Sequence, residues 1–169
     1  SYSEKEISEM KQQIKIASDS GADGVVLGAL NKNNNIDVES MNQLMEICKQ
    51  NNLKITFHRA FDAMQNPIET IELLIKLSVS RILTSGTLWE ENKSALEGTN
   101  NLNQFINKAK NKIEIVIAGG INNQNVGMIL DRLNLSKSKI SVHSYSGVQE
   151  NGFTKLELVK ALVREVQKI

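Results

Sequence analysis

Two histidines are the only imidazoles in this chain, and each ends a short apolar segment that predicts a β-strand. His58 and His143 each follow a small hydroxyl residue two positions earlier, Thr56 and Ser141, and both members of each pair share one face of their strand. In a barrel of parallel strands, both imidazoles would lie in the upper interior, where barrel enzymes place their sites. The spacing predicts a shared site; the alternative is two hydrogen-bonded histidines of the core.

Arg59 and Asp62 follow His58 on the turn from the predicted strand into a loop. A guanidinium can hold an anionic substrate through two parallel hydrogen bonds, and a carboxylate can orient an imidazole or an arginine. We take His58, Arg59, Asp62 and His143 as candidate catalytic residues, with His58 as the acid/base group. The competing interpretation is an Arg59–Asp62 ion pair that only fixes the loop.

Small residues end or follow the later predicted strands. Glycine lets the backbone approach a ligand, and free amides can bind an anion. Many barrels bind phosphate in the loops after their last two strands. Tight turns without a ligand are the alternative. The candidate residues for substrate or anion binding are Ser85, Gly86, Gly119, Gly120 and Ser144.

The loop from Thr87 to Gly98 carries Trp89, Glu90 and Glu91. We expect a solvated loop in which the tryptophan is a buried aromatic anchor, because an apolar ring gains most from burial. The alternative is a lid over the site.

Sulfur ligands are the natural ligands of copper(I). Met41, Met45 and Cys48 are spaced to share one face of a predicted helix, but Leu44 joins the same stripe. Such a stripe is typical of core packing. The two histidines are the other candidate metal pair, and no carboxylate triad accompanies them. We therefore assign no metal ligand in this chain.

Helices and strands alternate along the chain. Ser3 and Glu6 form a capping-box pattern, and Asp37 is expected to cap the helix that follows it. Asn66-Pro67 predicts a further helix start, and Asn122 is expected to cap a later helix. The pattern Thr154-Lys-Leu-Glu157 predicts one more capping box, before the final helix to about residue 168. The expected helices include residues 4–19, 38–51 and 100–110; the expected strands are 24–30, 54–61, 81–86, 114–120 and 139–145.

Strict alternation predicts a parallel sheet with helical crossovers. Two architectures fit: an open doubly wound sheet and part of a (β/α)8 barrel. A full barrel needs about 200 residues or more and eight strands, so length alone favours the open sheet.

Bulk properties limit the function classes. A chain of 169 residues is one domain, and a net charge of +1 gives no electrostatic case for nucleic acid or an anionic membrane. No apolar run is long enough to span a membrane, and the polar opening helix is not a signal peptide. The single cysteine, Cys48, excludes an internal disulfide and fits a reducing compartment.

Six motifs run in order through nearly the whole chain: Gly21-Ala-Asp-Gly-Val-Val26, Thr56-Phe-His-Arg-Ala-Phe-Asp62, Arg81-Ile-Leu-Thr-Ser-Gly86, Ser94-Ala-Leu-Glu-Gly98, Gly119-Gly-Ile-Asn122, and the strand that ends at His143. Their order and spacing resemble those of the CutC copper-homeostasis family, and the Phe-His-Arg-Ala-Phe-Asp run is the most specific. The resemblance implies a (β/α)8 barrel, of which this chain holds units four to eight and the preceding helix. Two departures are a longer loop at 87–93 and Tyr145, where the family has small residues.

The expected fold is therefore an α/β domain of the TIM-barrel type over residues 1–169, incomplete, with about five parallel strands and their helices. Such a piece has two unpaired edges and an open core, so we expect a longer polypeptide or partner chains, as in a homo-oligomer, to cover the gap.

The resemblance implies a cytoplasmic protein of copper homeostasis with copper(I) as a ligand, although the family's proposed copper-binding cysteines lie in the leading third that is absent here. The alternative function is a barrel enzyme of unknown reaction that acts on a small anionic or phosphorylated metabolite. A scaffold role is the third and weakest reading. The expected partners are a small molecule or a copper ion, and neither nucleic acid nor a membrane.

Overall fold

The main sheet has five parallel strands whose spatial order follows the sequence. The computed structural model describes residues 1–136 and 138–168. Doubly wound sheets reverse their strand order at a switch point, so the order β1-β2-β3-β4-β5 identifies a sheet of the barrel type. The strands are β1 (Gly24–Leu27), β2 (Lys54–Phe57), β3 (Arg81–Thr84), β4 (Glu114–Ile117) and β5 (Ile140–Val142).

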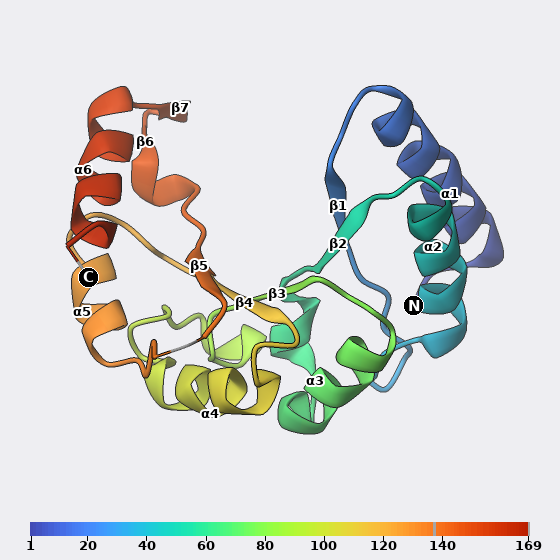
Figure 1. The fold of residues 1–169 in the computed structure, drawn as a ribbon, viewed down its shortest axis with the longest axis horizontal. Helices are drawn as coiled ribbons and strands as arrows, with labels where there is room; N and C mark the ends of the chain where they lie inside the picture. The colour runs from blue at the N-terminus through green and yellow to red at the C-terminus, as the bar shows by residue number, and fades with distance from the viewer. Residues whose placement is uncertain (137, 169) are drawn as a thin grey trace.

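The helices lie on the convex side of this curved sheet, and the concave side faces an open hollow (Figure 1). Short 3-10 turns follow three of the strands: η1 (Arg59–Ala63), η2 (Trp89–Glu91) and η3 (Ser146–Val148). The helices are α1 (Glu4–Asp19), α2 (Val38–Gln50), α3 (Pro67–Lys76), α4 (Thr99–Ala109), α5 (Val126–Asp131) and α6 (Leu156–Val166).

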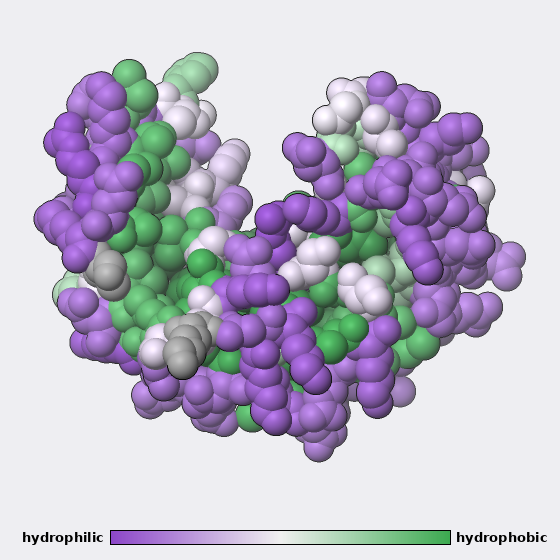
Figure 2. Space-filling model, in the orientation of Figure 1, coloured by the Kyte–Doolittle hydropathy of each residue, from purple (hydrophilic) through white to green (hydrophobic). Residues whose placement is uncertain are grey.

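The core lies between the helices and the convex face of the sheet. Ile55, Phe57 and Ile82 point to that face and are buried. On the other face, Val26 of β1 is 64% exposed. Successive side chains of a strand alternate between the two faces of the sheet, which explains this difference in burial. Figure 2 shows the hollow on the concave side, between the wall that carries α6 and the wall that carries α1. The fold is thus the expected incomplete barrel type, with no closed barrel in the described residues.

Several predicted helix starts are confirmed. The Ser3 hydroxyl accepts from the Glu6 backbone N–H, and the Glu6 carboxylate accepts from the Ser3 backbone N–H. Asp37 caps α2 by accepting from the Ser40 N–H at 3.1 Å. α3 begins at Pro67 as predicted. These starts fix where the helices leave the strand-to-helix loops.

The strands are shorter than predicted, because turns begin at their carboxyl ends. The expected strand 54–61 ends at Phe57, since His58 Nδ1 accepts from the Ala60 N–H and opens η1. Asn122 does not cap a helix directly. It accepts from the N–H groups of Gln124 and Asn125 in a preceding turn, and α5 begins only at Val126.

The predicted capping box at Thr154 is wrong. Thr154 belongs to a hairpin of β6 (Gln149–Glu150) and β7 (Phe153–Thr154), and α6 starts at Leu156 without a side-chain cap. Asn151 and Gly152 form the hairpin turn at positive φ, and Asn-Gly is a strong signal for such turns. Thr154 is therefore paired in the hairpin and does not cap the helix.

No helix in the described residues is long and apolar enough to cross a membrane. The outermost strands, β1 and β5, each have one neighbour in the sheet. A strand edge without a neighbour presents unpaired backbone groups. Cover for these edges by a longer polypeptide or by partner chains stays a prediction.

The one-sided core can be tested on two aliphatic residues. In the 169-residue chain, Ile82→Ala should lower the free energy of unfolding by about 2–4 kcal/mol, because it leaves a cavity under the helices. Val26→Ala should cost less than about 1 kcal/mol, because its side chain is largely solvated. Urea unfolding measures both. An equal loss from Val26→Ala would mean that a further chain covers the concave face in solution.

Candidate functional site

The Asp62 carboxylate is the centre of a polar network at the carboxyl ends of β2 and β3. Its side chain is 1% exposed. It accepts from Arg59 Nε at 2.7 Å, from Ser85 Oγ at 2.9 Å and from the Ser85 N–H at 3.1 Å. The Thr84 hydroxyl also donates to it. A buried charge is tolerated only when paired and hydrogen-bonded, so these partners fix η1 against the end of β3.

Arg59 is held on two sides. Nε donates to Asp62, and Nη2 donates to Ser85 Oγ at 2.8 Å. The guanidinium carbon lies 5.1 Å from the centre of the Trp89 ring, within the range of a cation–π contact. A guanidinium has five N–H donors, so donors remain on Nη1. A Cβ at Gly119 would lie 2.8 Å from the Ser85 Cβ and 3.6 Å from Nη1, so the Gly119 backbone lies close beside this group.

Two cavities open at this end of the sheet, and both are lined by Arg59 and Leu83. The first has a volume of about 560 Å³. The second has a volume of about 230 Å³. The further residues of the first cavity are His58, Ala60, Ala63 and Trp89. The further residues of the second are Ala118, Gly119, Gly120, Ile121, His143, Tyr145 and Ser146.

His58 is a neutral imidazole at neutral pH. Burial lowers the pKa of the His58 imidazole below its usual 6.5, because the charged form loses water contacts. Nδ1 accepts from the Ala60 N–H at 3.2 Å, which places the ring proton on Nε2. The edge of the ring packs against Phe57. His58 can therefore donate a hydrogen bond from Nε2 to a molecule in the first cavity.

The two histidines lie at the same end of the sheet but line different cavities. Strands β3 and β4 separate the strands that carry them. The His143 N–H donates to the Ile117 carbonyl at 2.8 Å and continues the pairing of β5 with β4. The structure thus brings His58 and Arg59 together, and Arg59 and His143 together, with the arginine between the cavities.

Gly119 and Gly120 line the second cavity with backbone that carries no side chain. The Gly119 carbonyl accepts from the Ala95 N–H, and the Gly120 carbonyl accepts from Asn125 Nδ2 at 2.8 Å. Within residues 1–136 and 138–168, the amide N–H groups of both glycines have no hydrogen-bond partner. Successive free N–H groups form a concavity that suits an anion.

The other three candidate anion contacts do not line either of the two cavities. Ser85 is fully buried, and its hydroxyl accepts from Arg59 and donates to Asp62. The Ser144 hydroxyl donates to the Ile121 carbonyl at 2.6 Å. Gly86 packs against the Gly98 carbonyl, which a Cβ would approach to 2.5 Å. These residues shape the rim rather than face the cavities.

The Gly86–Gly98 contact closes the base of the loop that carries Trp89. The Thr87 hydroxyl donates to the Lys93 carbonyl at 3.3 Å and ties the loop internally. The expectation that Trp89 is a buried anchor is wrong, since its side chain is 57% exposed. Sequence reasoning considered Trp89 only as a buried anchor or as part of a lid, and it did not predict that Trp89 lines the first cavity. It also missed Leu83, whose apolar strand position carries no functional signal.

The sulfur stripe of α2 does not fit a copper(I) site. Met41, Leu44 and Cys48 are fully buried in the core, and burial raises the pKa of the Cys48 thiol to about 11. Copper(I) is bound by the thiolate. In the part of the chain that the structure describes, no group of three His, Cys, Asp or Glu side chains could hold a metal ion.

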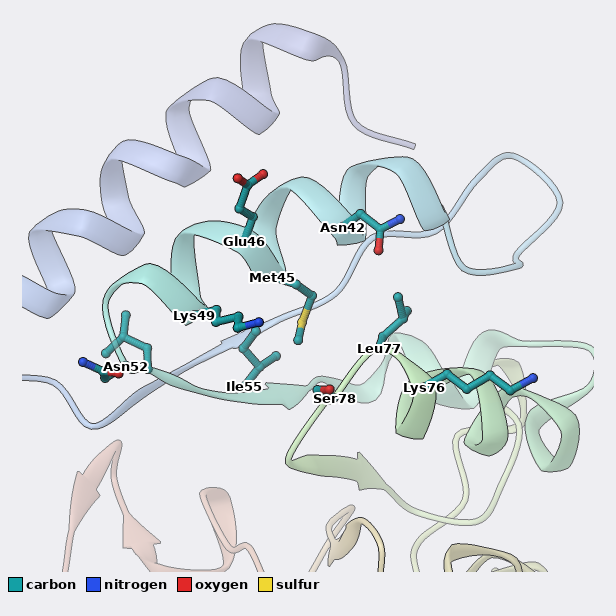
Figure 3. Close-up of a pocket in the computed structure, with 10 residues that line it drawn as sticks. Asn42, Met45, Glu46, Lys49, Asn52, Ile55, Lys76, Leu77 and Ser78 are labelled. Carbon is teal, nitrogen blue, oxygen red and sulfur yellow. The ribbon is translucent and has the colours of Figure 1, made fainter.

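A groove of about 630 Å³ lies between α2 and α3, at the amino ends of the strands (Figure 3). Met45 and Leu77 face it, and Lys49 and Lys76 lie along its walls. Its charged groups are flexible lysines and Glu46, and no imidazole lines it. It lies at the opposite end of the sheet from the Asp62 network and is separate from the candidate site.

The fold and the site define a class of protein: a parallel α/β chain of the TIM-barrel type with a polar site at the carboxyl ends of its strands. The comparison with known proteins narrows this class. The chain belongs to the CutC family, whose model matches residues 1–144. The resemblance in the six motifs is thereby confirmed.

Named relatives share this family. A copper homeostasis protein cutC homolog from Homo sapiens is 42% identical over 130 residues, which cover 77% of this chain and 45% of that protein. A family protein CutC from Pasteurella multocida (strain Pm70) is 35% identical over 144 residues, which cover 85% and 57% of the two chains. The chain thus spans about half the length of the curated relatives it matches.

A solved structure supports the fold. The crystal structure of the putative copper homeostasis protein CutC from Streptococcus agalactiae matches with a TM-score of 0.75 at 29% identity. The match covers 83% of this chain and 65% of that one. The open five-stranded sheet therefore has the arrangement found in a larger family member.

The state of His58 predicts a pH dependence of stability. Its pKa is lower in the folded than in the unfolded chain, so the unfolded chain takes up more protons as the pH falls through 6.5. The free energy of unfolding should fall between about pH 7.5 and about pH 5 for this reason. His58→Gln should flatten this dependence in urea unfolding, and His143→Gln is the control for loss of an imidazole. An unchanged slope in His58→Gln would contradict the assignment.

Proposed function

We propose that this protein acts in cytoplasmic copper homeostasis and that the mouth at the strand carboxyl ends binds a small anionic molecule. The names of the CutC relatives support the first part. The second rests on one observation: Asp62 and Ser85 hold Arg59 beside Gly119, in a cavity that Gly120 also lines.

Preorganisation is the physical argument for an anion. The Arg59 guanidinium is oriented before a ligand arrives, so binding loses little side-chain freedom. Its remaining donors and two backbone amides can surround the oxygens of a phosphate or carboxylate. Asp62 pairs with Arg59 through Nε, so the anion is bound by the remaining guanidinium donors together with the neutral amides. His143, which lines the same cavity, is a further contact for the bound anion.

An enzyme that uses the same mouth is the second candidate, and His58 favours it. The imidazole is neutral and keeps its Nε2 proton. A neutral imidazole of this kind can polarise a carbonyl or phosphoryl oxygen of a bound metabolite. In this reading Arg59 and the two glycines bind the anionic group, and His58 contacts the reacting part.

Copper(I) as a direct ligand of this chain has less support. The buried thiol of Cys48 and the buried thioether of Met41 are poor ligands in their present places. Met45 faces the groove between α2 and α3, and it is the one sulfur-bearing residue among the described residues that line the groove. Copper ligands of a whole CutC protein would therefore come from outside the described residues. A homo-oligomer is one arrangement that would cover the concave face.

The anion proposal is tested with inorganic phosphate by isothermal titration calorimetry. Arg59→Gln should weaken phosphate binding by about tenfold or more, because a charge-assisted hydrogen bond is lost. Arg164→Gln removes an exposed arginine on α6 and should leave the affinity unchanged. No phosphate binding by the parent protein, or equal losses in both variants, would overturn the proposal.

The copper question is tested by titration with copper(I) and a competing chelator under reducing conditions. We expect no stoichiometric tight binding by the 169-residue chain, because its sulfur atoms are buried or scattered. Tight binding that survives Cys48→Ala but not the loss of both histidines would place a copper site at the mouth. That result would refute our assignment.

A further inference from the structure

The two cavities that share Arg59 and Leu83 differ in chemistry. The larger one has apolar walls from Ala60, Ala63 and the indole of Trp89. The smaller one has the free amides of the paired glycines and the His143 ring. A ligand that fills both must therefore be largely apolar at one end, where His58 is the one polar side chain beside Arg59 among the described lining residues, and anionic at the other, because a polar group without a partner is costly to bury.

Trp89 makes the apolar end specific for a flat group. The guanidinium of Arg59 lies over the indole ring, and the side chain remains 57% exposed. A solvent-exposed indole beside an oriented guanidinium is a surface on which a second planar group can stack. The Gly86–Gly98 contact fixes the base of its loop, so the ring is held near the mouth.

We infer that the ligand of this mouth is an organic anion with a planar apolar body, which lies against Trp89 and Leu83 while its anionic group contacts Arg59, Gly119 and Gly120. The inference rests on the proposed anion site and adds the class of molecule that the site selects. Ribose phosphates without a base, or inorganic anions, would fill only the smaller cavity. An aryl phosphate or an aromatic carboxylate would fill both.

Two phosphate monoesters with the same charged group provide the test. Calorimetry should give phenyl phosphate a Kd about tenfold or more below that of methyl phosphate, because the ring stacks and loses apolar surface to water. Trp89→Ala should reduce the ratio of the two Kd values to about one, and Trp89→Phe should keep most of it. Phe153→Ala removes an aromatic side chain that is 75% exposed on β7, and it should leave the ratio as in the parent.

The outcomes separate the two levels of the proposal. If both esters bind with equal Kd, the inference fails and the anion site stands. If phenyl phosphate is preferred but Trp89→Ala keeps the preference, the ring binds elsewhere and the inference also fails. If neither ester binds, the anion site fails and the inference falls with it. A preference that Trp89→Ala abolishes and Trp89→Phe retains supports both.

Discussion

The Asp62 carboxylate is taken out of water where β2 ends, and its need for partners organises the surrounding residues. Thr84 and Ser85 supply two hydroxyl groups and a backbone N–H from the end of β3, and Arg59 supplies the opposite charge. Loss of one member of such a group leaves an uncompensated charge in the interior. The network therefore holds the end of β2 against the end of β3. It also fixes the direction of Arg59, which lines both cavities.

Curvature brings this network into contact with the later strands. The helices lie on the convex side of the sheet (Figure 1). The segments that follow the strands can therefore approach one another on the concave side. The neighbours of β3 are β2 and β4, which is why Arg59 after β2 reaches Gly119 after β4. In a doubly wound sheet, a helix layer would cover this side as well.

Much of the fold could be predicted from the sequence because its signals are local. Ser3 with Glu6, Asp37 and Pro67 begin helices through contacts within a few residues. The local rules gave a wrong prediction where two signals competed. Asn151-Gly152 forms a hairpin turn, so Thr154 pairs with Gln149 in the hairpin and does not cap the helix. The motif run around His58 also indicated the end of β2, where the structure has the Asp62 network.

The details of the site depend on contacts between residues that are far apart in the sequence. The hydrophobic periodicity of a single segment does not predict such contacts. The hydroxyl of Ser85 could equally have faced a ligand, and only the position of Asp62 explains why it is buried. The exposure of Trp89 depends on how its loop is closed by Gly86 and Gly98, which lie 12 positions apart in the sequence. The separation of the two imidazoles likewise follows from sheet order and not from their matching spacing.

The close approach of Gly86 and Gly98 has an evolutionary consequence. Because the two ends of the intervening segment meet, its interior can gain, lose or exchange residues while the strand and the following helix keep their places. Selectivity could then diverge between family members through one replaceable segment, at little cost to folding.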